Sequence, residues 1–189
     1  MVARLSSIQR LWTYWRPKVA PTISIEQSDK PKVEDIMIYN QNHIPKNKWR
    51  YGPWSSALVG CGWVATYNAL CLLGDRRDPG ELIDYYERQL PLINGTFGTQ
   101  FWGPYRYFKS HGYETRLILD PDKYDALAGD VNILFYHWRS GIRLGAHFVC
   151  IQRTENGFLS FNTYKNSTGN FQLSITTTCA MIIQKEELL

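Results

Sequence analysis

One cysteine stands where a protein chain can activate a thiol. Cys61 lies between Gly60 and Gly62, at the start of an apolar run that predicts a helix. The first turn of a helix offers unpaired backbone N–H groups and the positive end of the macrodipole, which lower a cysteine pKa and supply donors for an oxyanion. We therefore interpret Cys61 as a candidate nucleophile, favoured as a thiolate. The alternative is that Cys61 is one of four cysteines that act as small buried hydrophobic residues.

A nucleophilic cysteine needs a base, and His147 is the best placed of the four histidines. It opens a predicted strand directly after Gly145-Ala146, so a thiol and a substrate can approach its ring while the strand anchors it. His43 falls in a predicted loop and His111 ends a predicted helix. His137 lies inside an apolar strand, where we expect a structural role.

Asn162 is the candidate that would orient this base. It ends a predicted strand that a turn at Thr154-Glu155-Asn156-Gly157 joins to the strand of His147, and Asn-Gly is a strong hairpin signal. We expect its carboxamide to accept a hydrogen bond from one imidazole nitrogen and fix the ring without adding charge. The alternative for Asn162 is an ordinary turn residue at a strand end.

The periodicity of the chain predicts the elements that must position these residues. Helices are expected over residues 62–73, 79–90 and 99–111, with Gly74 and Gly112 as stops. Strands are expected over residues 114–119, 132–138, 146–153, 157–162 and 174–184, with a short strand at 36–39 and a long ordered loop over 41–59. Helices followed by strands indicate an α+β fold, with helices packed on one side of an antiparallel sheet.

The N-terminal segment is expected to be separate from the compact domain. Residues 2–16 predict a basic amphipathic helix that Pro17 ends, and residues 17–35 read as an extended linker. The predicted organisation is therefore an N-terminal helix and linker over 1–35 and one domain over 36–189. We favour docking of the helix on the domain or on a partner over contact with a membrane surface through residues 2–16. An inhibitory or targeting role for residues 1–35 is a further hypothesis.

Composition excludes several classes of protein. The 189 residues are 44% hydrophobic and 20% charged, which is typical of a globular domain, and the net charge of +4 lacks the dense basic block of a nucleic-acid-binding protein. The cysteines show no ligand spacing for a metal, so no metal or other cofactor is expected. No secretory signal and no apolar run long enough to span a membrane is present in the sequence, which predicts a cytoplasmic location.

Four short motifs occur in the order of one enzyme family. They are Tyr39-Asn40-Gln41, Gly60-Cys61-Gly62, Gly145-Ala146-His147 and Phe161-Asn162-Thr163. Over about residues 36–183 the chain resembles the papain-like cysteine peptidases, and within them the small bacterial members similar to the C39 type. The resemblance implies a papain-like fold, in which the nucleophile opens a central helix packed against a C-terminal antiparallel sheet.

The same resemblance implies a role for each motif. Cys61 would be the nucleophile, His147 the general base and later acid, and Asn162 the residue that orients the imidazole. The Gln41 side chain and the Cys61 backbone N–H would form the oxyanion hole, and Trp63 would narrow the primed side of the cleft. The implied function is a cysteine peptidase that cleaves an amide bond of a peptide or protein through an acyl-enzyme.

Two alternatives stay open at this stage. One is an acyltransferase or transglutaminase-like enzyme that uses the same triad, because fold and triad do not fix the acceptor. The other is a non-catalytic papain-fold module that binds a protein partner through the aromatic loop from Trp49 to Trp63 and the N-terminal helix.

Overall fold

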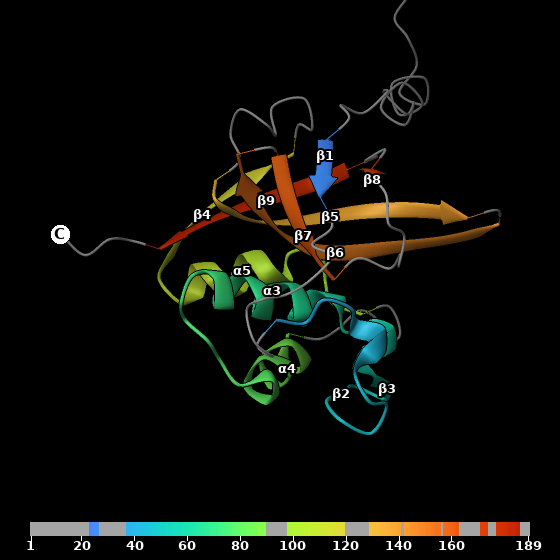
Figure 1. Cartoon of the computed structure of the whole chain (residues 1–189). Coiled ribbons are helices and arrows are strands. Elements are labelled where there is room, and N and C mark those ends of the chain that lie inside the picture. The colour runs from blue at the N-terminus through green and yellow to red at the C-terminus, as the bar shows by residue number, and fades with distance from the viewer. Residues whose placement is uncertain are drawn as a thin grey trace, which may run out of the picture.

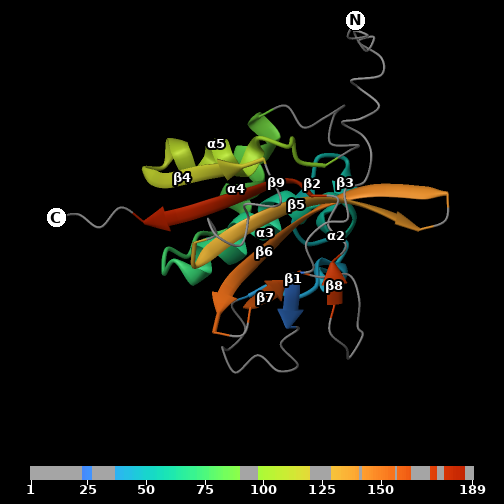
Figure 2. The same cartoon turned by 90° about the horizontal axis from the view of Figure 1, so that it is seen from above.

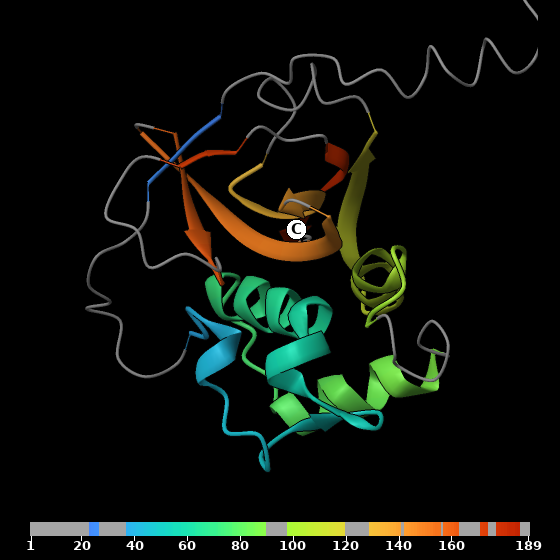
Figure 3. The ribbon, with the colours of Figure 1, turned by 90° about the vertical axis from the view of Figure 1, so that its right-hand side faces the viewer.

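Helices and a curved sheet form two layers (Figure 1, Figure 3). The structure is a computed structural model that describes residues 23–26, 37–89, 98–119, 129–140, 142–155, 157–162, 171–173 and 177–185. The helical layer contains α3 (Cys61–Leu72), α4 (Pro79–Arg88) and α5 (Gly103–Ser110), with the short elements η1 (Gln41–His43) and α2 (Ser56–Val59) ahead of them. A two-stranded ribbon of β2 (Arg50–Tyr51) and β3 (Trp54–Ser55) lies beside α2.

Among the described residues, the sheet has seven strands in the order β4-β9-β5-β6-β7-β1-β8. Its strands are β1 (Ile23–Glu26), β4 (Tyr113–Ile118), β5 (Val131–Ser140), β6 (Arg143–Thr154), β7 (Gly157–Phe161), β8 (Phe171–Leu173) and β9 (Thr177–Lys185). All neighbouring pairs are antiparallel except β1 and β7, which run parallel. The predicted α+β class is thus confirmed, with one parallel pair that the sequence did not indicate. The β5–β6 hairpin extends beyond the other strands (Figure 2).

The central helix α3 is the axis of the core. Every residue from Gly62 to Leu70 is buried, and the helix packs against β6 and β5 on one side and α4 on the other. It ends where predicted, because Gly74 adopts φ +73°. The Gly74 N–H donates to the Cys71 carbonyl oxygen, and the Asp75 N–H donates to the Leu70 carbonyl oxygen. This pair of hydrogen bonds is a Schellman motif.

Several predicted boundaries differ from the structure. Residues 37–39 form no strand, because the Asn68 side chain on α3 takes the place of a neighbouring strand and bonds both the N–H and the carbonyl of Ile38 at 2.9 Å. The predicted loop over 41–59 contains η1, β2, β3 and α2. The predicted helix over 99–111 begins only at Gly103, and the predicted strand over 174–184 begins at Thr177, with the unpredicted strand β8 before it.

A strand forms inside the predicted linker. Ile23–Glu26 is β1, and it lies between β7 and β8 in the sheet. Four residues of the segment 17–35 therefore contribute to the sheet instead of only connecting two parts of the chain. The predicted helix over 2–16, the rest of the linker and the boundary at Ile36 lie outside the described residues.

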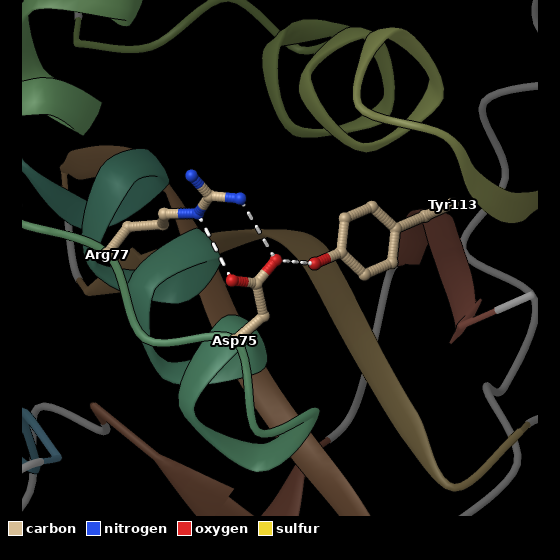
Figure 4. Close-up of polar contacts among 3 residues, drawn as sticks. All are labelled: Asp75, Arg77 and Tyr113. Atoms are coloured by element: carbon tan, nitrogen blue, oxygen red, sulfur yellow. Dashed lines mark hydrogen bonds and ion pairs between the residues drawn. The ribbon is translucent and has the colours of Figure 1, made fainter.

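A polar cluster joins the end of α3 to the first strand that follows the helices (Figure 4). The Asp75 carboxylate accepts a short hydrogen bond from the hydroxyl of Tyr113, at the start of β4. Arg77 donates to the same carboxylate through Nε at 3.2 Å and through Nη2 at 3.3 Å. Burial and the Asp75 carboxylate raise the pKa of Tyr113, so this hydroxyl remains protonated as a donor.

Within the described parts of the chain, no helix combines the length and the apolar character needed to cross a bilayer.

Candidate active site

Cys61 is the first residue of α3, as the sequence predicts. Close packing explains the glycine on each side of it. A Cβ on Gly62 would lie 2.2 Å from Thr99 Oγ1, and a Cβ on Gly60 would lie 2.5 Å from the Ser56 carbonyl oxygen. Only glycine therefore lets the segment around Thr99 and the preceding helix α2 approach the start of α3 this closely.

The thiol of Cys61 lies against the backbone of β6. Burial raises the pKa of the Cys61 thiol above its ordinary value, and the nearby backbone N–H groups of Phe148, Gly62 and Cys61 act in the opposite direction without offsetting it. The predicted preference for a thiolate is therefore wrong for the resting protein. The backbone donors expected at the start of a helix are present. Removal of the sulfur from water nevertheless destabilises the thiolate by more than these donors stabilise it.

His147 lies in β6 immediately before Phe148 and is fully buried. Its Nε2 lies 2.8 Å from the backbone carbonyl oxygen of Asn162. Because a carbonyl oxygen only accepts, Nε2 carries the hydrogen, and in the neutral ring Nδ1 is the acceptor. Burial lowers the pKa of His147 to about 4, against an opposing contribution from the Asn162 bond, so the imidazole is neutral at pH 7.

Asn162 holds the imidazole through its backbone and not through its side chain. The residue has φ +75°, a left-handed conformation that asparagine tolerates better than most residues. Its carboxamide points to Gln41, where Oδ1 accepts from the Gln41 backbone N–H at 2.7 Å and Nδ2 donates to Gln41 Oε1 at 2.9 Å. The expectation that the carboxamide accepts from the ring is wrong, because the ring already bonds to the carbonyl beside it.

Gln41 completes a buried chain of polar contacts. It is the first residue of η1, and it has no exposed surface. Its Nε2 donates to the Ala57 carbonyl oxygen in α2 at 3.1 Å, four residues before Cys61. The hydrogen bonds thus run from α2 through Gln41 and Asn162 to His147, and the Cys61 sulfur meets the strand at the residue after His147.

Trp63 does not reach a cleft. Its side chain is fully buried, and its ring packs edge-on against Trp49 at 5.8 Å and Tyr67 at 6.5 Å. Its Nε1 donates to Ser56 Oγ at 3.0 Å. The expectation that Trp63 narrows the primed side is therefore wrong, because this position of α3 faces the core and not the site.

The other histidines lie elsewhere in the fold. His43 is the exposed last residue of η1, and His111 is exposed after α5, with its ring stacked on Tyr107. His137 pairs with Ala146 in the β5–β6 ladder. Within the parts of the chain that the structure describes, no three histidine, cysteine, aspartate or glutamate side chains gather closely enough to hold a metal ion.

Two tyrosines near the thiol were not among the predicted site residues. Burial raises the pKa of Tyr51 to about 12 and also raises the pKa of Tyr136, and the charge that Cys61 would carry adds to both shifts. Tyr51 is fully buried and its hydroxyl accepts from Thr99 Oγ1 at 3.3 Å. The Ser140-Gly141 turn signal could have revealed Tyr136, since a hairpin closed there sets Tyr136 opposite His147.

Comparison with known proteins finds structural likeness but no sequence relative. No family model matches the chain, and no curated protein matches it. Among solved structures, the chain is similar to the peptidase domain of Streptococcus ComA, a bifunctional ABC transporter involved in a quorum-sensing pathway. The identity is 18%, the match covers 67% of this chain and 91% of that domain, and the TM-score is 0.44.

Proposed function

We propose that the chain is a papain-like thiol hydrolase that cleaves an amide bond of a peptide or protein through an acyl-enzyme on Cys61. The observation that supports this best is the buried chain of hydrogen bonds from Gln41 through Asn162 to His147, at the strand that the Cys61 sulfur touches. Four separate segments of the sequence supply these residues. The side chains of Gln41 and Asn162 are linked directly and the Asn162 backbone carbonyl continues the chain to His147, and buried polar networks of this kind fix the geometry of their members.

In the proposed reaction, the resting pair is a neutral thiol and a neutral imidazole. The Cys61 sulfur attacks the substrate carbonyl carbon as its proton passes to His147 Nδ1, which creates a tetrahedral oxyanion and an imidazolium. The oxyanion is stabilised by the Cys61 backbone N–H and the Gln41 side-chain amide. Collapse breaks the C–N bond, the leaving amine takes the proton from His147, and water then releases the acyl group by the reverse proton transfers.

His147 is unprotonated at pH 7, so Nδ1 has the acceptor form that the proposed proton transfer needs. A pKa of about 4 is that of a weak base, so the proposed reaction requires the developing oxyanion and the substrate complex to raise the pKa of the imidazole. The Asn162 carbonyl accepts from Nε2–H and stabilises the imidazolium that forms, without introducing a second buried charge. The Asn162 carboxamide would act on Gln41, by holding it at the start of the site.

The test compares cysteines of the same protein. Cys61→Ala should abolish hydrolysis across a panel of fluorogenic peptides, whereas Cys71→Ala, a partly buried cysteine on the same helix, should leave hydrolysis within about twofold of wild type. Trapping with a peptide aldehyde or vinyl sulfone, followed by mass spectrometry, should place the adduct on Cys61. Full activity in Cys61→Ala would refute the assignment.

The resting electrostatics favour a second candidate, a papain-fold module that binds a protein without catalysis. The raised pKa of Cys61 and the complete burial of His147 are what an inert core pair would show. Covalent trapping of Cys61 by a peptide electrophile distinguishes the two functions. An inert module gives no Cys61 adduct with any peptide electrophile and reacts with iodoacetamide only as a free thiol does, at alkaline pH.

A further inference from the structure

Tyr136 lies directly opposite His147 in the sheet. The two residues are partners in the antiparallel β5–β6 ladder, so their side chains share one face and are nearest neighbours. The rings meet nearly at right angles, at 83°, with centroids 5.6 Å apart. This is an edge-to-face contact with the proposed base, and Tyr136 itself is only partly buried.

The sheet changes register at this tyrosine. Along the β5–β9 ladder, Phe135 is opposite Cys179 but Tyr136 is opposite Thr177, so Thr178 is an extra residue on β9. Such a bulge bends the strand and increases the local twist, and bulges often re-aim a side chain beside a functional site. The irregularity therefore falls at the rung that carries His147 on the adjacent strand.

Two contacts restrain the imidazole in different directions. The hydrogen bond from Nε2 to the Asn162 carbonyl oxygen holds one nitrogen of the ring. The edge-to-face contact with Tyr136 opposes a tilt of the ring about that bond, because a tilt would break the aromatic contact. Since burial keeps the Tyr136 hydroxyl protonated, the tyrosine adds no charge near Cys61 while it does so.

We propose that Tyr136 is a positioning residue of this site, whose ring holds the His147 imidazole in the plane from which Nδ1 accepts the Cys61 proton. The inference rests on the proposed function. It goes beyond that function by assigning to the ring, and not to the hydroxyl, a role in setting the rate.

Three variants distinguish the effect of the Tyr136 ring from the effect of its hydroxyl and from a general loss of packing. Tyr136→Phe keeps the ring, Tyr136→Leu removes it, and Phe135→Leu is the matched control, since Phe135 packs on Phe148 at 4.7 Å on the other face of the same strands. We expect Tyr136→Phe to keep kcat within about twofold. Tyr136→Leu should lose roughly 10- to 100-fold in kcat with little change in KM, because a misplaced base costs on this order. Phe135→Leu should lower Tm but retain kcat.

Imidazole nitrogen chemical shifts give a readout that does not need turnover. In wild type and Tyr136→Phe, the His147 ring should give sharp nitrogen signals with hydrogen on Nε2, whereas in Tyr136→Leu a tilted ring should weaken the bond to Asn162 and shift or broaden the Nε2 signal. A normal kcat and an unchanged His147 spectrum in Tyr136→Leu would overturn the proposal, and so would a large loss in Tyr136→Phe.

The proposal can also be tested if Tyr136→Leu does not fold or if Cys61→Ala stays active. If Tyr136→Leu does not fold, an NMR cross-relaxation contact between the Tyr136 and His147 rings in wild type supports the proposal, and its absence overturns it. If Cys61→Ala stays fully active, the proposed function fails, while the imidazole shifts still decide whether Tyr136 positions the ring.

Discussion

The Nε2–H of His147 donates to the backbone carbonyl oxygen of Asn162, and the carboxamide of the same asparagine bonds reciprocally to Gln41. One residue thus joins two others through two different groups. The left-handed backbone of Asn162 makes this possible, because it turns the carbonyl and the side chain to different partners.

Substitutions at Asn162 can therefore separate its backbone from its side chain. Asn162→Gly permits φ +75° and keeps the carbonyl bond, so His147 should retain a single Nε2–H tautomer by imidazole NMR. Asn162→Ala should lose about 1 kcal/mol more stability than the glycine variant, because alanine is strained at this φ. An averaged tautomer in Asn162→Gly would show that the carboxamide is needed to orient the ring.

Asn162→Asp tests the bond to Gln41. A carboxylate cannot donate to Gln41 Oε1, so two oxygen atoms would face each other inside the protein. We expect a loss of about 1–3 kcal/mol in the free energy of unfolding at pH 7, measured by urea denaturation. Partial recovery at acid pH, where the carboxyl is protonated, is the matching control.

The pKa of His147 predicts how stability depends on pH. The value is about 4 in the folded protein and near 6.5 in an unfolded chain, so between these values the unfolded state binds more protons. Stability is then fully present above about pH 6.5 and decreases as pH falls toward 4, by about 3 kcal/mol from this residue. Urea denaturation at pH 7 and pH 4 should show a smaller decrease for His147→Gln than for wild type. Equal decreases in the two proteins would contradict the lowered pKa.

The glycine after Cys61 should tolerate no larger side chain. Gly62→Ala would push a methyl group into Thr99, and overpacking of this kind costs about 1–3 kcal/mol. The double variant Gly62→Ala with Thr99→Gly should recover part of that loss, which a double-mutant cycle by thermal denaturation can measure. Additive effects in the cycle would mean that the two residues do not clash.

In the polar cluster that joins α3 to β4, Tyr113 should contribute more to the free energy of unfolding than Arg77 does. Tyr113 is buried and donates to the Asp75 carboxylate, and loss of a bond to a charged group costs about 1.5–3 kcal/mol, so Tyr113→Phe should destabilise the protein. The Arg77 side chain is 44% exposed, and Arg77→Ala should cost at most about 1 kcal/mol. Chemical denaturation of both variants makes the comparison, and the reverse order would contradict it.

Local pattern determined much of the fold. The spacing of apolar residues located α3, α4 and the long strands, Gly74 marked a helix end, and the Asn-Gly turn predicted the β6–β7 hairpin. These features depend on neighbours within a few residues, which a sequence displays directly. For the same reason Cys61 could be placed at the start of a helix and His147 in a strand.

Only the tertiary structure decided which atoms of these residues meet. Ile38 pairs with a helix side chain 30 residues away, and Gln41 bonds to Asn162 across 121 residues, so neither contact leaves a local signal. The direction of a carbonyl or an amide depends on φ, and the pKa values of Cys61 and His147 depend on burial, which exists only after packing. The sequence by itself thus determined which residues could do chemistry, whereas the packed fold decided that the thiol rests neutral and that a backbone carbonyl holds the imidazole.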